Sequence, residues 1–168
     1  MIIILSINYQ PSTINYQLST INYQLSTINH QPLSIEQKTA ELVSEFDLFD
    51  NSMDRYEYII EMGKALPEMK EALKTEDRLV NGCQSKVWLD AKKEGDKLVF
   101  TADSNTVITK GIIAILIRIL SEEQPKTIAE NNFEFIDKID LRAHLSSQRS
   151  NGLTGMIQLM KQYAIKYS

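Results

Sequence analysis

Apolar positions in the first half of the chain, from residue 34 onward, recur at helical spacing. Between residues 34 and 49 they fall on one helical stripe that ends at Phe49. The run Ser34-Ile35-Glu36-Gln37 is typical of a capping box, which predicts that a helix begins here. A second helix is predicted from a cap at Asp50 or Ser52 to a stop near Pro67, because proline cannot continue a helix.

The pattern then changes from helical spacing to alternation. Apolar residues alternate with polar ones from Ser85 to Lys92, which predicts a strand with one buried face. Glu94-Gly95-Asp96 is a plausible hairpin turn, and residues 97–102 are the expected return strand. A further short strand is predicted at residues 78–81. These strands would form a small antiparallel sheet.

The segment Val107 to Leu120 is apolar nearly all round and follows a potential cap at Asn105 or Thr106. Its unbroken apolar run is far shorter than the roughly 20 residues that span a bilayer, so we expect a central buried helix. Pro125 would start a shorter helix, residues 136–145 another, and residues 151–167 the last, after a polar loop at 146–149. Helices, then a sheet, then helices indicate an α+β fold, with a small antiparallel sheet packed against several helices.

The first 35 residues contain no charged side chain, although the whole chain has 18 basic and 22 acidic residues. They consist largely of near-identical heptads, such as Ser12 to Leu18 and Ser19 to Leu25. A coiled coil is disfavoured because e/g charges are missing, and a targeting peptide because a basic start is missing, whereas a sticky strand repeat remains an alternative. We therefore predict that residues 1–33 are an extension outside the fold and that the domain covers residues 34–168.

Net charge and the count of metal-binding residues exclude several classes of site. The net charge of −4 disfavours a basic nucleic-acid surface. One cysteine and two histidines cannot form an intramolecular disulfide, a four-ligand Cys/His zinc site, or a four-cysteine cluster in one chain. The single thiol is therefore either a small hydrophobic residue of the core or a reactive group.

The thiol of Cys83 follows Asn81-Gly82, a pair that marks a tight turn before the strand pattern resumes. Gly82 would allow close approach of another backbone, and Lys86 would favour the thiolate. The alternative is a buried cysteine that only packs. By residue type alone packing is the more common role of a single cysteine, and the polar turn around Cys83 weakens that interpretation.

The residues Gly82-Cys83-Gln84-Ser85, followed by Val87 and Trp88, are very similar to the signature of SufE-type sulfur acceptor proteins. Segments 58–67, 103–114 and 147–156 resemble further parts of the same family in the same order. The resemblance covers residues 35–168, whereas residues 1–33 have no counterpart. It implies an α+β fold similar to that of the IscU-type scaffold.

The resemblance also implies a function. Such a protein would take persulfide sulfur from a SufS-type cysteine desulfurase on Cys83, stimulate that enzyme, and deliver sulfur to a SufBCD-type scaffold for iron–sulfur cluster assembly. It would not be a stand-alone enzyme and would need no cofactor, because pyridoxal phosphate belongs to the desulfurase. Gly82, Gln84 and Arg149 would support the loop or bind the partner. We expect a cytoplasmic protein without nucleic-acid or membrane partners, for which a homodimer is plausible.

Four other residues have both a structural and a functional interpretation. For Trp88 we favour core packing over shielding of the sulfur, and for Asp103 a turn or cap over proton transfer. Arg149, in the polar loop, is either a surface residue or a partner contact, and His144 is structural or exposed. Two other functions stay open: a cysteine-dependent hydrolase, for which His144 is the only histidine outside the repeats, and a non-catalytic binding module.

Overall fold

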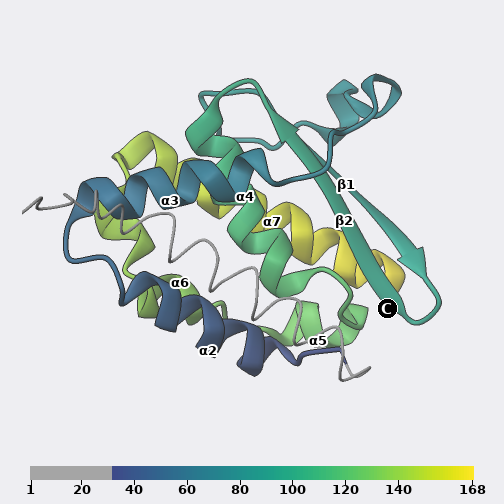
Figure 1. Ribbon diagram of the computed structural model, residues 1–168. Coiled ribbons are helices and arrows are strands. Elements are labelled where there is room, and N and C mark those ends of the chain that lie inside the picture. Colours follow the sequence, from purple (N-terminus) through teal and green to yellow (C-terminus); the bar gives the residue numbers. More distant parts are fainter. Residues whose placement is uncertain (1–31) are drawn as a thin grey trace, which may run out of the picture. The chain divides into compact units, whose positions relative to one another are not determined.

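The structure is a computed structural model that describes residues 32–168, and within it Ser34–Ser168 form one compact unit. The predicted extension of residues 1–33 lies almost wholly outside the described residues, so its separation from the fold stays a prediction. The α helices and the strands named below are labelled in Figure 1.

The first two helices are α2 (Ile35–Phe46) and α3 (Ser52–Lys64). The predicted capping box is confirmed: the Ser34 backbone amide donates to Gln37 Oε1 at 2.9 Å and the Gln37 amide donates to Ser34 Oγ at 3.3 Å. Two details were wrong. Helix α2 ends at Phe46, before the predicted end at Phe49, and the cap of α3 is Asn51, whose side chain accepts from the Asp54 amide.

Strands β1 (Val87–Glu94) and β2 (Lys97–Ser104) form an antiparallel hairpin, in which Glu94 pairs with Lys97 across the predicted turn. Two short 3₁₀ helices, η1 (Glu71–Leu73) and η2 (Glu76–Arg78), precede it. The strand expected at residues 78–81 is reduced to a single bridge between Leu79 and Trp88, because Arg78 is still helical.

Helix α4 (Val107–Leu120) has the predicted bounds and is the central buried helix of the unit. It packs against α2, α3, α7 (Ser147–Tyr167) and β2. A Cβ atom on Gly63 of α3 would lie 2.5 Å from the backbone nitrogen of Gly111. The two glycines therefore let α3 and α4 cross in backbone contact, which a side chain would prevent.

The C-terminal part departs from the predicted pattern twice. The helix expected over residues 136–145 is divided into α6 (Phe135–Lys138) and η3 (Leu141–His144), because Asp140 adopts a left-handed conformation with φ of 52°. The expected loop at 146–149 is mostly helical: Ser146 caps α7, which begins at Ser147. The helix predicted at Pro125 is α5 (Pro125–Glu130).

The predicted α+β architecture is confirmed: one two-stranded antiparallel sheet and several helices make up the described unit. Within residues 32–168, no helix is both long and apolar enough to cross a membrane.

Candidate functional site

Residues 79–86, here called the cysteine loop, connect η2 to β1. The bridge between Leu79 and Trp88 and the hydrogen bond from the Val80 amide to the Val87 carbonyl (2.9 Å) tie the start of this loop to β1. Gly82 has φ of 83°, a conformation that L side chains rarely adopt, and a Cβ there would meet only the Asn151 carbonyl at 3.7 Å. The expectation of a close backbone approach at Gly82 was therefore wrong: the glycine is required by the turn conformation.

The cysteine loop instead approaches the backbone of helix α7 closely, at two glycines of that helix three residues apart. A Cβ on Gly152 would lie 2.9 Å from Cys83 Sγ, and a Cβ on Gly155 would lie 2.1 Å from the Asn81 carbonyl oxygen. We call this pair the glycine seat. The cysteine loop thus rests directly on the backbone of α7, and Cys83 is half-buried there.

A cavity of about 590 Å³ opens beside the thiol and brings together three of the predicted site residues, Cys83, Gln84 and Arg149. The fourth predicted site residue, Gly82, directly precedes Cys83 in the cysteine loop. The rest of the lining comes from the start of α4 and the first turns of α7, together with Ser85 and Asn105. These other lining residues are Ser85, Asn105, Thr106, Ile108, Thr109, Ile112, Ser146, Gln148, Gly152 and Met156.

Burial raises the pKa of the Cys83 thiol above its ordinary value of 9.0. The expected activation by Lys86 was wrong for this conformation. Lys86 does not line the cavity, and its backbone is bound by the Asn105 side chain (2.9 Å) and the Ser104 hydroxyl (2.9 Å). While the loop rests on α7, Cys83 is therefore held mainly as the neutral thiol at neutral pH.

Arg149 lies in the first turn of α7, and its expected place in a loop was wrong. Its guanidinium lies 5.9 Å from the centre of the Tyr56 ring of α3, within cation–π range. None of the ion pairs found in the described part of the chain involves Arg149. It therefore contributes a positive charge to the cavity that an anion can use.

Ser85 and the start of α4 contribute hydroxyl groups to the cavity, which the sequence analysis missed. Thr106 Oγ1 lies 2.8 Å from Thr109 Oγ1 and 3.0 Å from Ser85 Oγ, so the start of α4 is hydrogen-bonded to the cysteine loop. Serine and threonine at a helix start usually indicate only a cap, so no sequence signal distinguished them. The glycine seat did have a signal in the sequence, because Gly152 and Gly155 lie three residues apart within a predicted helix.

The remaining candidates lie elsewhere. Trp88 is half-buried on the face of β1 opposite Val87 and Leu89, with the Lys74 ammonium 5.9 Å from its ring centre, so the expected core packing was wrong. It does not line the cavity, and neither does His144, which lies in η3 with its Nε2 buried and without a hydrogen-bond partner.

Asp103 is a buried residue of β2, so the expected turn or cap role was wrong. Its carboxylate accepts from Lys74 Nζ at 2.8 Å and Lys110 Nζ at 2.9 Å. Burial opposes ionisation, but the bonds from the two lysines outweigh it, and the pKa of Asp103 is lowered.

In the described part of the chain, no group of three or more His, Cys, Asp or Glu side chains could hold a metal ion.

Comparison with known proteins identifies the family. The model of the SufE family, described as an Fe-S metabolism associated domain, matches residues 40–164. The chain belongs to the SufE family. This membership gives it a role in iron–sulfur metabolism.

Individual SufE relatives agree with this assignment. The chain is 40% identical over 129 residues to an uncharacterised SufE-like protein of Rhizobium meliloti, covering 74% of this chain and 92% of the relative. It is 33% identical to the chloroplastic/mitochondrial SufE-like protein 1 of Arabidopsis thaliana, over 76% of this chain and 35% of that protein. The solution structure of a hypothetical Thermus thermophilus protein shares the fold, with a TM-score of 0.66, 19% identity, and coverage of 77% and 95%.

Proposed function

We propose that this SufE protein accepts sulfur on Cys83 from a SufS-type cysteine desulfurase, stimulates that enzyme, and delivers the sulfur to a SufBCD-type scaffold for cluster assembly. The observation that carries the proposal is the position of the single thiol. Cys83 lies in a turn against α7, at the wall of a cavity that also contains Gln84 and Arg149.

The chemistry needs one thiol on each protein. The Cys83 thiol loses its proton, and the thiolate attacks the outer sulfur of a persulfide on the partner cysteine. A new S–S bond forms at Cys83 while the S–S bond of the partner breaks, and the partner cysteine leaves as a thiolate that takes up a proton. No net oxidation or reduction occurs, so neither a redox cofactor nor a metal ion is required on this chain.

The cavity has room for a persulfide on Cys83. The added sulfur extends the side chain by one atom, and a volume of about 590 Å³ beside Cys83 can contain it. A persulfide anion in this space would be stabilised by the Arg149 charge and by hydroxyl groups such as that of Thr109. Enclosure would also limit its loss to other thiols.

Two other functions have less support from the site. A cysteine-dependent hydrolase needs a base within hydrogen-bond reach of the thiol. Among the described residues, no histidine lines the cavity, and His144 is in a different element. A binding module with a merely structural cysteine would not need a thiol that lines a cavity.

The decisive experiment is incubation of the protein with a cysteine desulfurase, pyridoxal phosphate and cysteine, followed by peptide mass mapping. The Cys83 peptide should gain the mass of one sulfur atom, and a reductant should remove it. The Cys83→Ser variant should fold but neither acquire sulfur nor stimulate turnover, because a serine hydroxyl is a far weaker nucleophile toward sulfur. Stimulation by Cys83→Ser at the wild-type level would overturn the proposal and favour the binding module.

Arg149→Ala is the matched control, because it keeps the thiol and removes only the charge beside it. We expect this variant to acquire sulfur still, with weakened docking or a less ordered cavity. If Arg149→Ala were as inactive as Cys83→Ser, the arginine would be needed for the transfer itself.

A further inference from the structure

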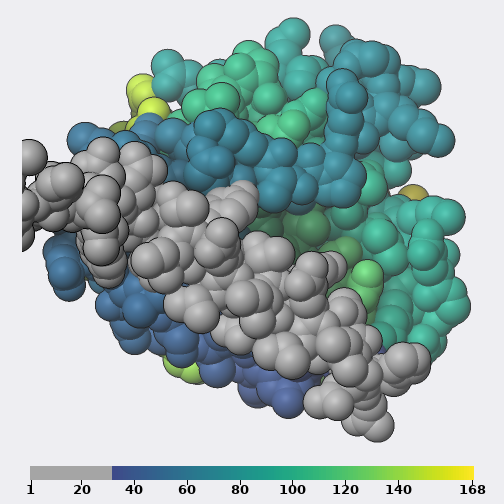
Figure 2. Space-filling view, viewed as in Figure 1, coloured from purple at the N-terminus to yellow at the C-terminus, as the bar shows by residue number. Residues whose placement is uncertain are grey.

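Residues 70–78, here called the strap, contain η1 and η2 and lead directly into the cysteine loop. None of these nine side chains is buried, although Met69 before the strap and Val80 after it are. In the space-filling view the strap forms the upper right corner of the visible face (Figure 2). Without apolar burial, a segment opens at low cost unless polar contacts hold it.

Two ion pairs supply such contacts between the strap and the hairpin. Lys74 Nζ lies 2.8 Å from Asp103 Oδ2, with side-chain exposures of 16% and 12%, and Arg78 Nε lies 2.9 Å from Asp90 Oδ1, with exposures of 26% and 21%. Leaving a charge unpaired costs more where water cannot replace its partner. The less exposed pair, Lys74 with Asp103, is therefore the stronger connection.

The end of β2 also holds the other side of the cysteine loop. The Ser104 hydroxyl donates to the Lys86 carbonyl at 2.9 Å, and the Lys86 amide donates to the Asn105 side chain at 2.9 Å. Three consecutive residues, Asp103 to Asn105, thus bind the chain on both sides of Cys83. Asp103 holds the upstream side through a charge on the strap, and its two neighbours hold the downstream side through neutral hydrogen bonds.

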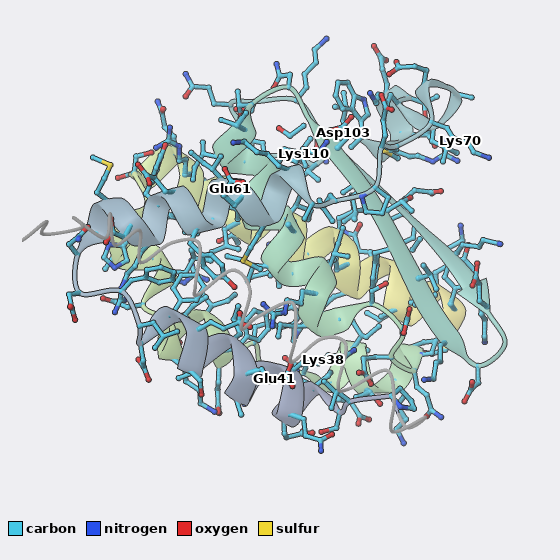
Figure 3. The ribbon with its side chains drawn as sticks, viewed as in Figure 1. Lys38, Glu41, Glu61, Lys70, Asp103 and Lys110 are labelled. Atoms are coloured by element: carbon cyan, nitrogen blue, oxygen red, sulfur yellow. The ribbon has the colours of Figure 1, made fainter. Side chains whose placement is uncertain are left out.

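We propose that Lys74 is a positioning residue for Cys83, which acts through its ion pair with Asp103 to keep the strap on the hairpin and the thiol against Gly152. When the pair separates, the strap leaves the hairpin and the contacts of Leu79 and Val80 with β1 loosen. The cysteine loop then leaves α7, and Cys83 becomes accessible. Figure 3 shows Asp103 on the hairpin close to Lys110 of α4, and Lys70 on the strap. The inference concerns only the position of the thiol, so it holds or fails independently of whether Cys83 carries sulfur.

The chain offers matched controls. Lys110 binds the same carboxylate at 2.9 Å but lies in α4, so Lys110→Met removes an equal charge without releasing the strap. Lys70 is an exposed lysine of the strap itself with no ion pair among the described residues, so Lys70→Met tests the loss of any strap charge. Lys74→Met keeps an apolar chain of similar length beside Trp88 and removes the charge, which also pairs with Glu71 inside the strap.

The test measures how fast iodoacetamide, a neutral reagent, alkylates Cys83 in the folded full-length chain. We expect Lys74→Met to react about five- to tenfold faster than wild type, because a hydrogen bond between charged groups is lost. Lys70→Met and Lys110→Met should stay within about twofold of wild type, and Lys74→Arg should restore slow alkylation. In an Asp103→Asn background, Lys74→Met should add little, since the two residues act as a pair.

Three results would overturn the proposal: an unchanged rate in Lys74→Met, equal acceleration by Lys74→Met and Lys110→Met, or a full Lys74→Met effect in the Asp103→Asn background. Hydrogen exchange of the wild-type protein gives a test that needs no variant. The backbone amides of the strap and of residues 79–83 should exchange as one unit and faster than the amides of β1 and β2. Equal protection of the strap and the hairpin would contradict the inference as well.

Discussion

At the scale of single residues, the site is organised by glycines around one thiol. Gly82 provides the positive φ that turns the chain at Cys83, whereas Gly152 removes the side chain that would occupy the place of the sulfur. The two glycines therefore have different physical roles, one conformational and one steric. Both are needed for a half-buried thiol at the wall of the cavity.

Substitution of Gly152 should displace the thiol. A Cβ at this position would lie 2.9 Å from Cys83 Sγ, closer than real Cβ atoms approach a neighbour, and the helix backbone cannot retreat. We expect Gly152→Ala to lower the free energy of unfolding by about 1–2 kcal/mol and to speed alkylation of Cys83. Gln158→Ala, on the exposed face of the same helix, is the control and should change neither. Unchanged alkylation in Gly152→Ala would show that the cysteine loop does not rest on α7.

The raised pKa of Cys83 predicts a pH dependence of stability. The folded state favours the neutral thiol, so this contribution is fully present below the ordinary pKa of 9.0 and is lost as the pH rises through the higher folded-state pKa. Urea unfolding at several pH values should therefore show the free energy of unfolding of wild type falling relative to that of Cys83→Ser as the pH rises above about 9. A difference independent of pH would mean that the thiol is solvated in the folded protein.

At the scale of elements, α4 contributes both the centre of the core and one wall of the cavity. Its middle is buried on all sides, and its first turn carries the hydroxyls of Thr106 and Thr109 that meet the cysteine loop. Stability and site geometry are therefore coupled through one helix. The strap is the opposite case, because it has no buried side chain and is held by charges.

Truncation within α4 should depend strongly on position. Ile115 is fully buried, so Ile115→Ala should lower the free energy of unfolding by about 2–5 kcal/mol through lost burial and the cavity left behind. Val107, in the first turn of the same helix, is 60% exposed. Val107→Ala should therefore change the free energy of unfolding by less than about 0.5 kcal/mol. Urea denaturation of both variants measures these values. A near-neutral Ile115→Ala would mean that α4 is not the core helix.

At the scale of the whole molecule, residues 34–168 form the compact unit that carries the proposed site. Helix α2 begins with its own capping box at Ser34, and the buried core of the described residues begins at Ile35. The SufE family match, at residues 40–164, lies inside the same unit. We therefore expect that the proposed chemistry needs no residue of the N-terminal repeats.

Deletion of residues 1–33 should accordingly leave the protein folded and active. We expect the thermal unfolding midpoint, the alkylation rate of Cys83 and the stimulation of a desulfurase to match those of the full chain. Differential scanning calorimetry and the alkylation assay measure the first two directly. A large loss of either would show that the repeats contribute to the fold, and the predicted boundary would be wrong.

The sequence alone determined the elements whose formation depends on near neighbours. The capping box at Ser34, the hairpin turn at Gly95 and the bounds of α4 follow from contacts between residues a few positions apart, and all three are confirmed. The motif around Cys83 likewise identified the family, because residue identity at fixed spacing needs no tertiary information. Cys83, Gln84 and Arg149 were predicted as site residues, and the structure places all three at one cavity.

Only the tertiary structure decided what depends on residues far apart in the chain. The contact of Cys83 with Gly152 joins positions about seventy residues apart, and the pair of Lys74 with Asp103 joins two elements on either side of the cysteine loop. The outward position of Trp88 and the helical break at Asp140 were also decided by packing. Local spacing determines which face of an element is apolar, but which element covers that face depends on the packing of the whole chain.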